Sequence, residues 1–448
     1  MKSKKSVLTV ISLVVMLSLA LAGCSGGSNV KDSSDSPNSN NQQSPTDSKP
    51  VELTIWGGYP ELDPWYKKMA EEYKKEHPNV TINIASFPLR DFEKKAAAGL
   101  PSGSAADIVS LNPVIALRYV QGNMLKQAPD DLAQMVTSGI YPDIVSDRAQ
   151  VNNTVYGIPH QLGKGVIYYN TKMFAEAGLT EPPTSIDQFL EYAQKLAKKD
   201  GSGNLERAGM SLRLTGGGSG LGEKFWTLLA QHGGSIVKEV SPGKYKANYD
   251  NEAGLKTLQM YIDMVHKYKT DDPTIKHDAE AFEMELAAFF VRESWVIGDI
   301  KEKAPNLEYA TAPLPKANVI GMSDFYVTNA AKEKEETAWD FIRFLMKPEN
   351  HKQMVAMTGW LPAREDLDME DFFQENPQFK AFFTKQELHA YPTIPEFDEI
   401  LTKFADRLSE KGFTDASFVD NPAKMEAFLA DLAKETNAIL KKAGHLAE

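Results

Sequence analysis

Residues 156–196 read YGIPHQLGKGVIYYNTKMFAEAGLTEPPTSIDQFLEYAQKL, and this stretch decides the fold prediction. The β-rich run at 166–169 predicts a strand, and Asn170 or Thr171 directly after it is a typical cap for a short helix. The sequence SIDQ at 185–188 fits a capping box, which predicts the start of a longer helix. A strand followed closely by helices indicates an α/β protein.

The residues nearer the N-terminus repeat this alternation of strand and helix signals. Strands are predicted at residues 51–56, 80–84 and 107–111, and helices at 64–77, 89–98 and 114–120. Trp65, Met69 and Tyr73 follow one another at intervals of four residues, so they share one face of the first helix. Gly99 is the predicted stop of the second helix. The alternation predicts a parallel sheet covered by helices, with right-handed crossovers.

The predicted strands end in residues that suit a sugar. In open α/β sheets, ligands bind outside the carboxyl ends of the strands. Trp56 and Tyr59 follow the first predicted strand, Phe87 the second and Asn112 the third. An aromatic ring can pack on the C–H face of a sugar, and an amide can hydrogen-bond its hydroxyl groups. Phe87 is interpreted as a core residue, whereas Trp56 and Tyr59 fit either a core role or a ligand contact.

Motifs in a fixed order extend over nearly the whole chain after residue 50. They are VELTIW at 51–56, AAAGLPSGSAADIV at 96–109, YGIP at 156–159, YNTKMFAEAGL at 169–179, PPTSIDQF at 182–189, FFVRESWVIGDI at 289–300, PLP at 313–315, AWDFIRFLMKPE at 338–349 and GWLPAR at 359–364. This ordered set resembles the extracellular solute-binding proteins of ABC importers, the carbohydrate-binding group in particular. One departure is the sequence Arg292-Glu293-Ser294, which replaces the glycine-containing turn that usually precedes the tryptophan equivalent to Trp295.

The resemblance implies an α/β, two-lobed periplasmic-binding-protein-like fold of type II, with the ligand cleft between the lobes. It implies the following division of the chain: signal peptide 1–23, disordered tether 24–50, first part of lobe one 51–160, first part of lobe two 161–314, second part of lobe one 315–362, and C-terminal helices mainly on lobe two 363–448.

The resemblance also indicates where the ligand contacts should lie. Trp295 would be a stacking platform on lobe two, and Trp226 a core residue of an amphipathic helix. The full set of candidate ligand-binding residues is Trp56, Tyr59, Asn112, His160, Gln161, Arg213, Trp295, Trp360 and Tyr391. Convergence of Lys164, His160 and Arg213 would favour an acidic sugar, and otherwise Lys164 is interpreted as a solvated surface residue.

The N-terminal residues predict a lipid anchor. Lys2, Lys4 and Lys5 precede a short apolar run that ends in LAGC at 21–24, a sequence that resembles the lipobox of bacterial lipoproteins. Cys24 is the only cysteine, so it cannot form a disulfide within the chain. By this resemblance, Cys24 receives a lipid, and residues 25–50, which carry one aliphatic residue and no aromatic residue, form a flexible tether to the bilayer.

The composition of the chain and its lack of recognised metal and catalytic motifs restrict the classes of function that it can have. The 448-residue chain has a formal net charge of −12, which disfavours nucleic-acid binding. GGGSGLG at 216–222 fits no phosphate-binding pattern, and no metal or catalytic motif is recognised. We therefore expect a monomeric, non-enzymatic lipoprotein without cofactors on the extracytoplasmic face of the cell membrane, which delivers a carbohydrate ligand to membrane permease subunits. The alternatives are a tethered glycan-active enzyme and a binding protein for a non-sugar solute.

Overall fold

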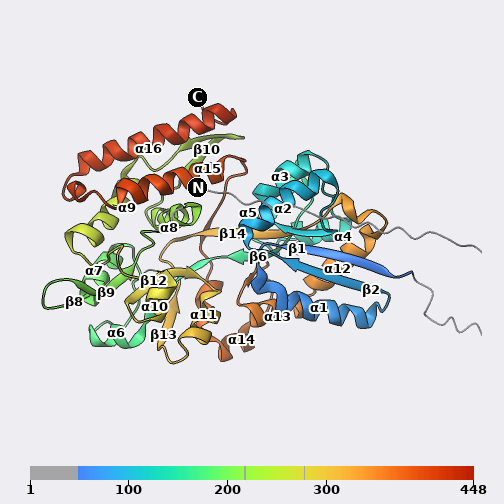
Figure 1. Cartoon of the computed structure of the whole chain (residues 1–448), viewed down its shortest axis with the longest axis horizontal. Helices are drawn as coiled ribbons and strands as arrows, with labels where there is room; N and C mark the ends of the chain where they lie inside the picture. The colour runs from blue at the N-terminus through green and yellow to red at the C-terminus, as the bar shows by residue number, and fades with distance from the viewer. Residues whose placement is uncertain (1–48, 216–217, 277) are drawn as a thin grey trace, which may run out of the picture. The chain divides into compact units, whose positions relative to one another are not determined.

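The computed structural model describes residues 49–215, 218–276 and 278–448. The predicted signal peptide, Cys24 and all but the last two residues of the tether lie outside this part of the chain. The described residues form two α/β lobes, each built around its own sheet (Figure 1). Within them, no helix combines the length and the apolar character that a membrane span requires.

Lobe one contains a mixed seven-stranded sheet. Its strand order is β15-β6-β14-β3-β1-β2, with β16 pairing on β14. β1 lies parallel to β2 and β3, as the alternating strands and helices predicted, whereas β14 runs antiparallel to β3 and β6. The strands are β1 (Val51–Gly57), β2 (Val80–Ser86), β3 (Ile108–Leu111), β6 (Ile158–Gly163), β14 (Ala317–Val327), β15 (Leu361–Pro362) and β16 (Glu387–Ala390).

Lobe two contains a five-stranded sheet in the order β13-β7-β12-β9-β8. Its strands are β7 (Gly165–Asn170), β8 (Lys198–Lys199), β9 (Leu205–Ser211), β12 (Ala287–Glu293) and β13 (Tyr309–Ala312). Two short hairpins lie outside the two sheets, β4 (Gln150–Val151) with β5 (Thr154–Val155) and β10 (Val237–Ser241) with β11 (Lys244–Ala247). Because β6 ends at Gly163 and β7 begins at Gly165, the chain passes from one sheet to the other at Lys164.

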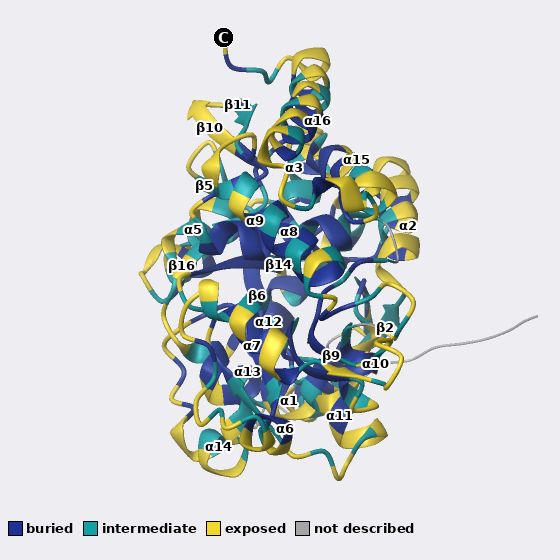
Figure 2. Ribbon diagram, turned by 90° about the vertical axis from the view of Figure 1, so that its left-hand side faces the viewer, coloured by how far each residue is buried: buried dark blue, intermediate teal, exposed yellow. Residues whose placement is uncertain are grey.

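Helices cover both sheets, and the central strands are buried between them (Figure 2). The helices of lobe one are α1 (Asp63–Glu76), α2 (Leu89–Ser102), α3 (Pro113–Gln121), α4 (Asp130–Thr137), α5 (Asp143–Arg148), α12 (Glu335–Met346) and α13 (Pro348–Thr358). Those of lobe two are α6 (Thr171–Glu176), α7 (Asp187–Leu196), α8 (Gly218–Gln231), α9 (Glu252–Ile262), α10 (Asp278–Glu283) and α11 (Val296–Lys303). The C-terminal helices are α14 (Glu370–Glu375), α15 (Phe397–Arg407) and α16 (Pro422–Ala443), of which α15 packs on α8, and α16 on α9 and β11.

The helix α1 buries the face that the spacing of its apolar residues predicts. Trp65, Met69 and Tyr73 are all buried, which confirms the face predicted from their spacing. The Trp65 indole N–H donates to the backbone carbonyl of Asn350 at 2.9 Å, so the ring is both buried and satisfied. The same helix ends at Glu76, next to the His77-Pro78 pair that predicted its end.

The predicted end of α2 at Gly99 is wrong, because the helix continues to Ser102. Gly103 adopts the left-handed conformation, with φ of 70°, and takes the capping position instead. Gly99 has a different role: a Cβ atom added there would lie 3.1 Å from the Trp56 ring, so the missing side chain lets β1 and α2 approach closely. One of the two hydrogen bonds of the predicted capping box is present at the start of α7. The Gln188 side chain accepts from the backbone N–H of Ser185, while the Ser185 hydroxyl caps nothing within the described residues.

A buried carboxyl in lobe one makes stability depend on pH. Asp324 of β14 is fully buried, and burial raises its pKa to about 8. The unfolded value is about 3.9, so between about pH 4 and pH 8 the folded chain holds a proton that the unfolded chain releases. The contribution of Asp324 to the free energy of unfolding therefore falls as the pH rises through this window, by at most about 1.4 kcal/mol per pH unit.

We expect Asp324→Asn to gain stability relative to the wild type as the pH is raised from 4 to 8. Denaturant unfolding at several pH values measures the difference. Asp143→Asn, a change at an exposed aspartate of α5, is the control. A difference that stays constant across the pH range would show that Asp324 is ionised in the folded chain.

Candidate functional site

A cleft of about 490 Å³ lies between the lobes. Both lobes supply its walls: α2, α3 and β14 on one side, and α8 and α15 on the other. Its lining residues are Tyr59, Leu89, Arg90, Phe92, Glu93, Ser110, Leu111, Asn112, Val114, Ile115, Arg118, Ser219, Gly220, Glu223, Gly321, Ser323, Tyr391, Pro395, Phe397, Asp398 and Glu399. Pockets of about 300–1,000 Å³ that combine aromatic walls with a few polar groups are typical ligand sites.

Three of the candidate residues line this cleft: Tyr59, Asn112 and Tyr391. Tyr59 follows β1, and its ring lies edge-on against Trp360 with 4.9 Å between the ring centroids. Burial and the nearby charge of Glu223 raise the pKa of Tyr59 to about 12, so its hydroxyl stays protonated. Asn112 follows β3, and its side-chain oxygen accepts from the backbone N–H of Val114, which caps α3. The carboxyl ends of β1 and β3 therefore meet at the cleft.

On lobe two, Glu223 and Tyr391 form a hydrogen-bonded pair in the cleft wall. The Tyr391 hydroxyl donates to Glu223 Oε2 at 2.5 Å, and within the described part of the chain it is the only hydrogen-bond donor to this carboxylate. Burial and the Glu223 charge raise the pKa of Tyr391 well above its usual value, so the hydroxyl remains a donor. The Tyr391 ring packs against Trp226 at 5.7 Å, which places it in the lobe-two core.

Arg90 joins the two lobes across the cleft. From α2 of lobe one, its guanidinium donates to the Ser219 hydroxyl at 2.8 Å and to Asp398 Oδ1 at 3.1 Å, both on lobe two. It also donates to Glu93 at 2.9 Å in its own helix. Three acceptors therefore engage the charge of Arg90, and the lobes touch at this side of the cleft.

His160 and Gln161 lie behind the cleft wall rather than in it. Both are buried in β6. His160 Nε2 and the Ser110 hydroxyl are hydrogen-bonded at 2.9 Å, and Ser110 itself lines the cleft. Burial and the neighbouring His351 lower the pKa of His160 well below its usual range, so its ring is neutral at neutral pH. His160 thus supports the cleft wall and carries no positive charge there.

The three candidate tryptophans lie outside the cleft lining formed by the described residues. Trp56 is half-buried, with the Lys95 ammonium 4.4 Å from its ring centroid. Trp360 is buried behind Tyr59 and so supports a lining residue. Trp295 is half-buried at the start of α11, with the Arg292 guanidinium 4.9 Å from its ring centroid. Direct ligand contacts by these rings stay predictions.

Neither Arg213 nor Lys164 is among the residues that line the cleft. Arg213 Nη1 lies 3.9 Å from Asp278 Oδ2. The interpretation of Lys164 as a solvated surface residue is wrong, because it is only 7% exposed. Its ammonium donates to the backbone carbonyl of Thr384 at 2.5 Å, and burial lowers its pKa to about 8. The convergence of cations that would favour an acidic sugar is therefore not present among the described residues.

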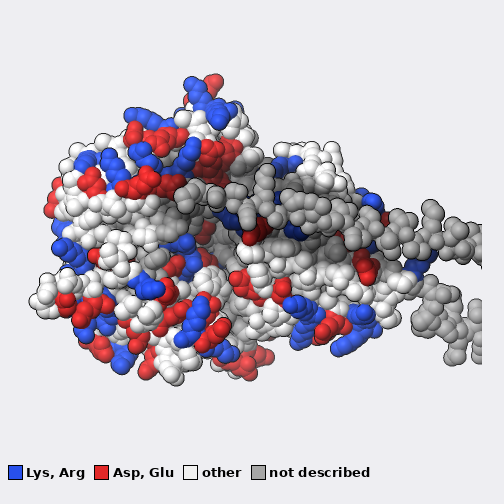
Figure 3. Space-filling view, viewed as in Figure 1, with Lys and Arg blue, Asp and Glu red and all other residues white. Residues whose placement is uncertain are grey.

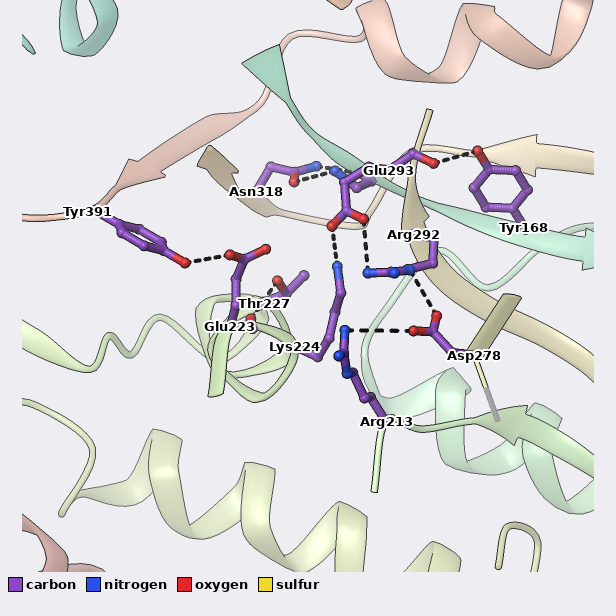
Figure 4. A network of polar contacts seen from close by, with 11 residues as sticks. Tyr168, Arg213, Glu223, Lys224, Thr227, Asp278, Arg292, Glu293, Asn318 and Tyr391 are labelled. Atoms are coloured by element: carbon purple, nitrogen blue, oxygen red, sulfur yellow. Dashed lines mark hydrogen bonds and ion pairs between the residues drawn. The ribbon is translucent and has the colours of Figure 1, made fainter. Parts of the chain in front are cut away.

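The unusual Arg292-Glu293 pair belongs to a network of polar contacts (Figure 4). Its charged members Lys224 and Asp278, like the pair itself, are not among the residues that line the cleft. Glu293 accepts from the Lys224 ammonium and lies 3.1 Å from Arg292 Nη1. Arg292 Nε in turn lies 2.9 Å from Asp278 Oδ1. Burial disfavours the charged form of Glu293, whereas the positive charges of Lys224 and Arg292 favour it. The two cations have the larger combined effect and hold the pKa of Glu293 at about 2. Lys224 and Glu223 are adjacent in α8, and the network holds Lys224 while Glu223 faces the cleft.

The candidate residues predicted from the sequence did not include Arg90, Glu223 or Asp398. A signal for Glu223 existed, because the charged pair Glu223-Lys224 directly precedes the apolar run FWTLLA in a predicted amphipathic helix. Arg90 and Asp398 gave no such signal. They lie in ordinary amphipathic helices and are 308 residues apart in the sequence.

The remaining chemistry of the described surface is unspecialised. No group of three or more His, Cys, Asp or Glu side chains in the described residues could hold a metal ion. On the face shown in Figure 3, basic and acidic side chains of the described residues are interspersed. The cleft, to which both lobes contribute, is the candidate ligand site among the described residues.

Two α/β lobes with a ligand-sized cleft between them define a two-lobed binding protein, and comparisons with known proteins agree. The bacterial extracellular solute-binding protein family matches residues 68–381. The chain is 23% identical over 420 residues to the galactooligosaccharide-binding protein of Bacillus subtilis, covering 89% of this chain and 90% of that protein. The chain belongs to the bacterial extracellular solute-binding protein family.

Solved structures of similar proteins share the fold. The cyclic alpha-maltosyl-1,6-maltose binding protein from Arthrobacter globiformis matches with a TM-score of 0.72 and 21% identity. The match covers 88% of this chain and 100% of that protein's chain. UgpB from Mycobacterium tuberculosis in complex with glycerophosphocholine matches with a TM-score of 0.69 and 19% identity, covering 88% and 99%. The prediction of an α/β, two-lobed, periplasmic-binding-protein-like fold is confirmed.

Proposed function

We propose that this chain is the solute-binding lipoprotein of an ABC importer, which captures a sugar or oligosaccharide outside the membrane and delivers it to the permease. The observation that carries the proposal is the composition of the cleft. Two tyrosines, an asparagine, four carboxylates and two guanidinium groups, contributed by both lobes, line a space of about 490 Å³ together with phenylalanine side chains. A sugar offers apolar C–H faces and hydroxyl groups together, which is what such a wall accommodates.

Family membership supports this function over the enzymatic alternative. The family is one of binding proteins, and the galactooligosaccharide-binding relative covers nearly the same length of chain. A non-sugar solute remains the second candidate, favoured by the structural likeness to a protein that holds glycerophosphocholine.

A thermal-shift screen of the full chain with neutral, amino and acidic oligosaccharides and with glycerophosphocholine tests the proposal. A true ligand at 100 times its Kd stabilises the folded chain by about 2.7 kcal/mol. Stabilisation by a saccharide, with the saccharide recovered unchanged, supports the sugar-binding function. Cleavage of the saccharide would support the enzyme, and stabilisation by glycerophosphocholine alone would support the non-sugar solute.

The lipid anchor has its own test. We expect Cys24→Ser to move the protein from the membrane fraction to a soluble pool or to leave its signal peptide uncleaved, because serine lacks the thiol that the lipid would modify. Fractionation and metabolic labelling with a fatty acid measure both. Normal processing with lipid label still present in the variant would contradict the lipoprotein assignment.

The contacts of Arg90 predict an effect on lobe closure. We expect Arg90→Ala to enlarge the radius of gyration of the ligand-free chain and to weaken ligand binding up to about five-fold, since an exposed ion pair contributes about 0–1 kcal/mol. Small-angle scattering and calorimetry measure the two effects. Arg343→Ala, which removes ion pairs to Asp131 and Glu336 within lobe one, is the control. Equal scattering curves for both variants would contradict this role.

A further inference from the structure

We propose that Glu223 sets the ligand class of the cleft: its carboxylate accepts hydrogen bonds from hydroxyl or ammonium groups of the ligand and excludes saccharides that carry a carboxylate. This inference rests on the proposed function and concerns the same cleft. It names a specificity-determining residue and the class of sugar that the residue favours.

Glu223 stands in the cleft wall. It lies in the first part of α8 and lines the cleft, partly buried, with one carboxylate oxygen held by the Tyr391 hydroxyl. Figure 4 shows Glu223 and Lys224 directed to different partners from adjacent positions of the helix. Tyr391 fixes the orientation of the carboxylate, so Oε1 is pre-positioned to accept from a ligand. A preorganised acceptor binds without the cost of ordering it first.

The cations of the network in Figure 4 are engaged by carboxylates. Lys224 is bound to Glu293, Arg292 to Glu293 and Asp278, and Arg213 approaches Asp278. These contacts bring three cations to two carboxylates, and none of the three cations is among the residues that line the cleft. His160 is buried and bonded to Ser110, so it adds no cation. The cations that were expected to bind an acidic sugar therefore do not line the cleft.

The cleft lining carries more acidic than basic side chains. Four carboxylates line the cleft, from Glu93, Glu223, Asp398 and Glu399, against two guanidinium groups, from Arg90 and Arg118. Arg90 is engaged by Glu93 and Asp398, and Arg118 is exposed. An additional carboxylate on the ligand would be desolvated next to like charge, which is unfavourable. A neutral hydroxyl pair or an ammonium group would instead gain a charge-assisted hydrogen bond.

A glycan array with neutral, amine-bearing and carboxylate-bearing oligosaccharides tests the ligand class on the full chain. We expect the strongest signals from neutral or amine-bearing glycans. Strongest binding to glycans with a carboxylate would overturn this inference and leave the proposed sugar-binding function standing. Binding to no glycan would overturn the proposed function, and the inference with it.

Calorimetry with the strongest array ligand then tests Glu223 itself. We expect Glu223→Gln to weaken this ligand by about ten-fold or more, because a hydrogen bond to a charged acceptor becomes one to a neutral amide. The same variant should bind the carboxylate-bearing analogue of that ligand more tightly than the wild type does. This reversal of charge preference is a result that a purely structural role would not produce.

Glu191→Gln is the matched control, since it removes the same charge from an exposed glutamate of α7 that pairs with Lys195. Melting curves confirm that both variants are folded, and glutamine retains an oxygen that can accept from Tyr391. Equal affinities for Glu223→Gln and Glu191→Gln, with an unchanged preference between neutral and acidic ligands, would overturn the inference.

Discussion

Glu293→Ala is expected to lower the free energy of unfolding by about 3–5 kcal/mol, the usual loss when one partner of a buried ion pair is removed. The side chain of Glu293 is 15% exposed, and that of Lys224 is 10% exposed. Alanine would leave Lys224 and Arg292 largely buried with less compensating charge. Denaturant unfolding measures the loss.

Two further variants separate charge from packing at this position. Glu293→Gln retains an acceptor for the Lys224 ammonium and should lose less, about 1–3 kcal/mol. The double variant Lys224→Met/Glu293→Met should be less destabilised than Glu293→Ala, because no lysine remains unpaired. A loss below about 1 kcal/mol for Glu293→Ala would mean that water or other carboxylates satisfy both cations.

Trp226→Ala is expected to lower the free energy of unfolding by about 3–5 kcal/mol as well, for a different reason. Trp226 is 3% exposed in α8, and its ring packs against Tyr391 at 5.7 Å and Phe397 at 5.6 Å. Alanine would leave a cavity that the surrounding helices cannot fill. A melting curve and denaturant unfolding measure the effect.

The same change should also disturb the ligand site, since Tyr391 and Phe397 both line the cleft. Trp226→Phe, which retains an aromatic ring, is the control and should keep most of the stability and affinity. A Trp226→Ala variant as stable as the wild type would show that α8 and α15 repack around the missing ring.

Much of the local structure could be predicted from the sequence, because it depends on contacts close along the chain. Asn170 caps α6 by accepting from the backbone N–H of Met173, as the residue type indicated. The predicted strands β1, β2 and β3 are present to within about two residues at each end. Errors arose where two signals competed. Gly99 and Gly103 are both possible stops for α2, and only the packing of Gly99 against Trp56 and the conformation of Gly103 decide between them.

The candidate site was predicted in part, for the same reason. Tyr59 and Asn112 were found because the ends of parallel strands meet at one edge of a sheet, a rule that needs only the order of the elements. Trp56 was grouped with Tyr59 because both stand near the carboxyl end of the first predicted strand. In the structure Trp56 is a residue of β1 that packs towards α2, near Lys95 and Phe87, while Tyr59 lies two residues beyond the end of β1 and reaches the cleft.

The sequence by itself determined the α/β class, the alternation of strands and helices and, through its ordered motifs, the two-lobed fold. The class and the alternation follow from residue types and spacings that act locally along the chain, whereas the two-lobed fold was implied by the resemblance of the ordered motifs to a known family. Only the tertiary structure decided which charges face the cleft. Arg90 meets Asp398 across 308 positions of sequence, and Tyr391 meets Glu223 across 168. Whether a charged side chain serves a ligand or is neutralised by a neighbour depends on such distant partners, because ionic contacts require proximity in space and leave no periodic trace in the sequence.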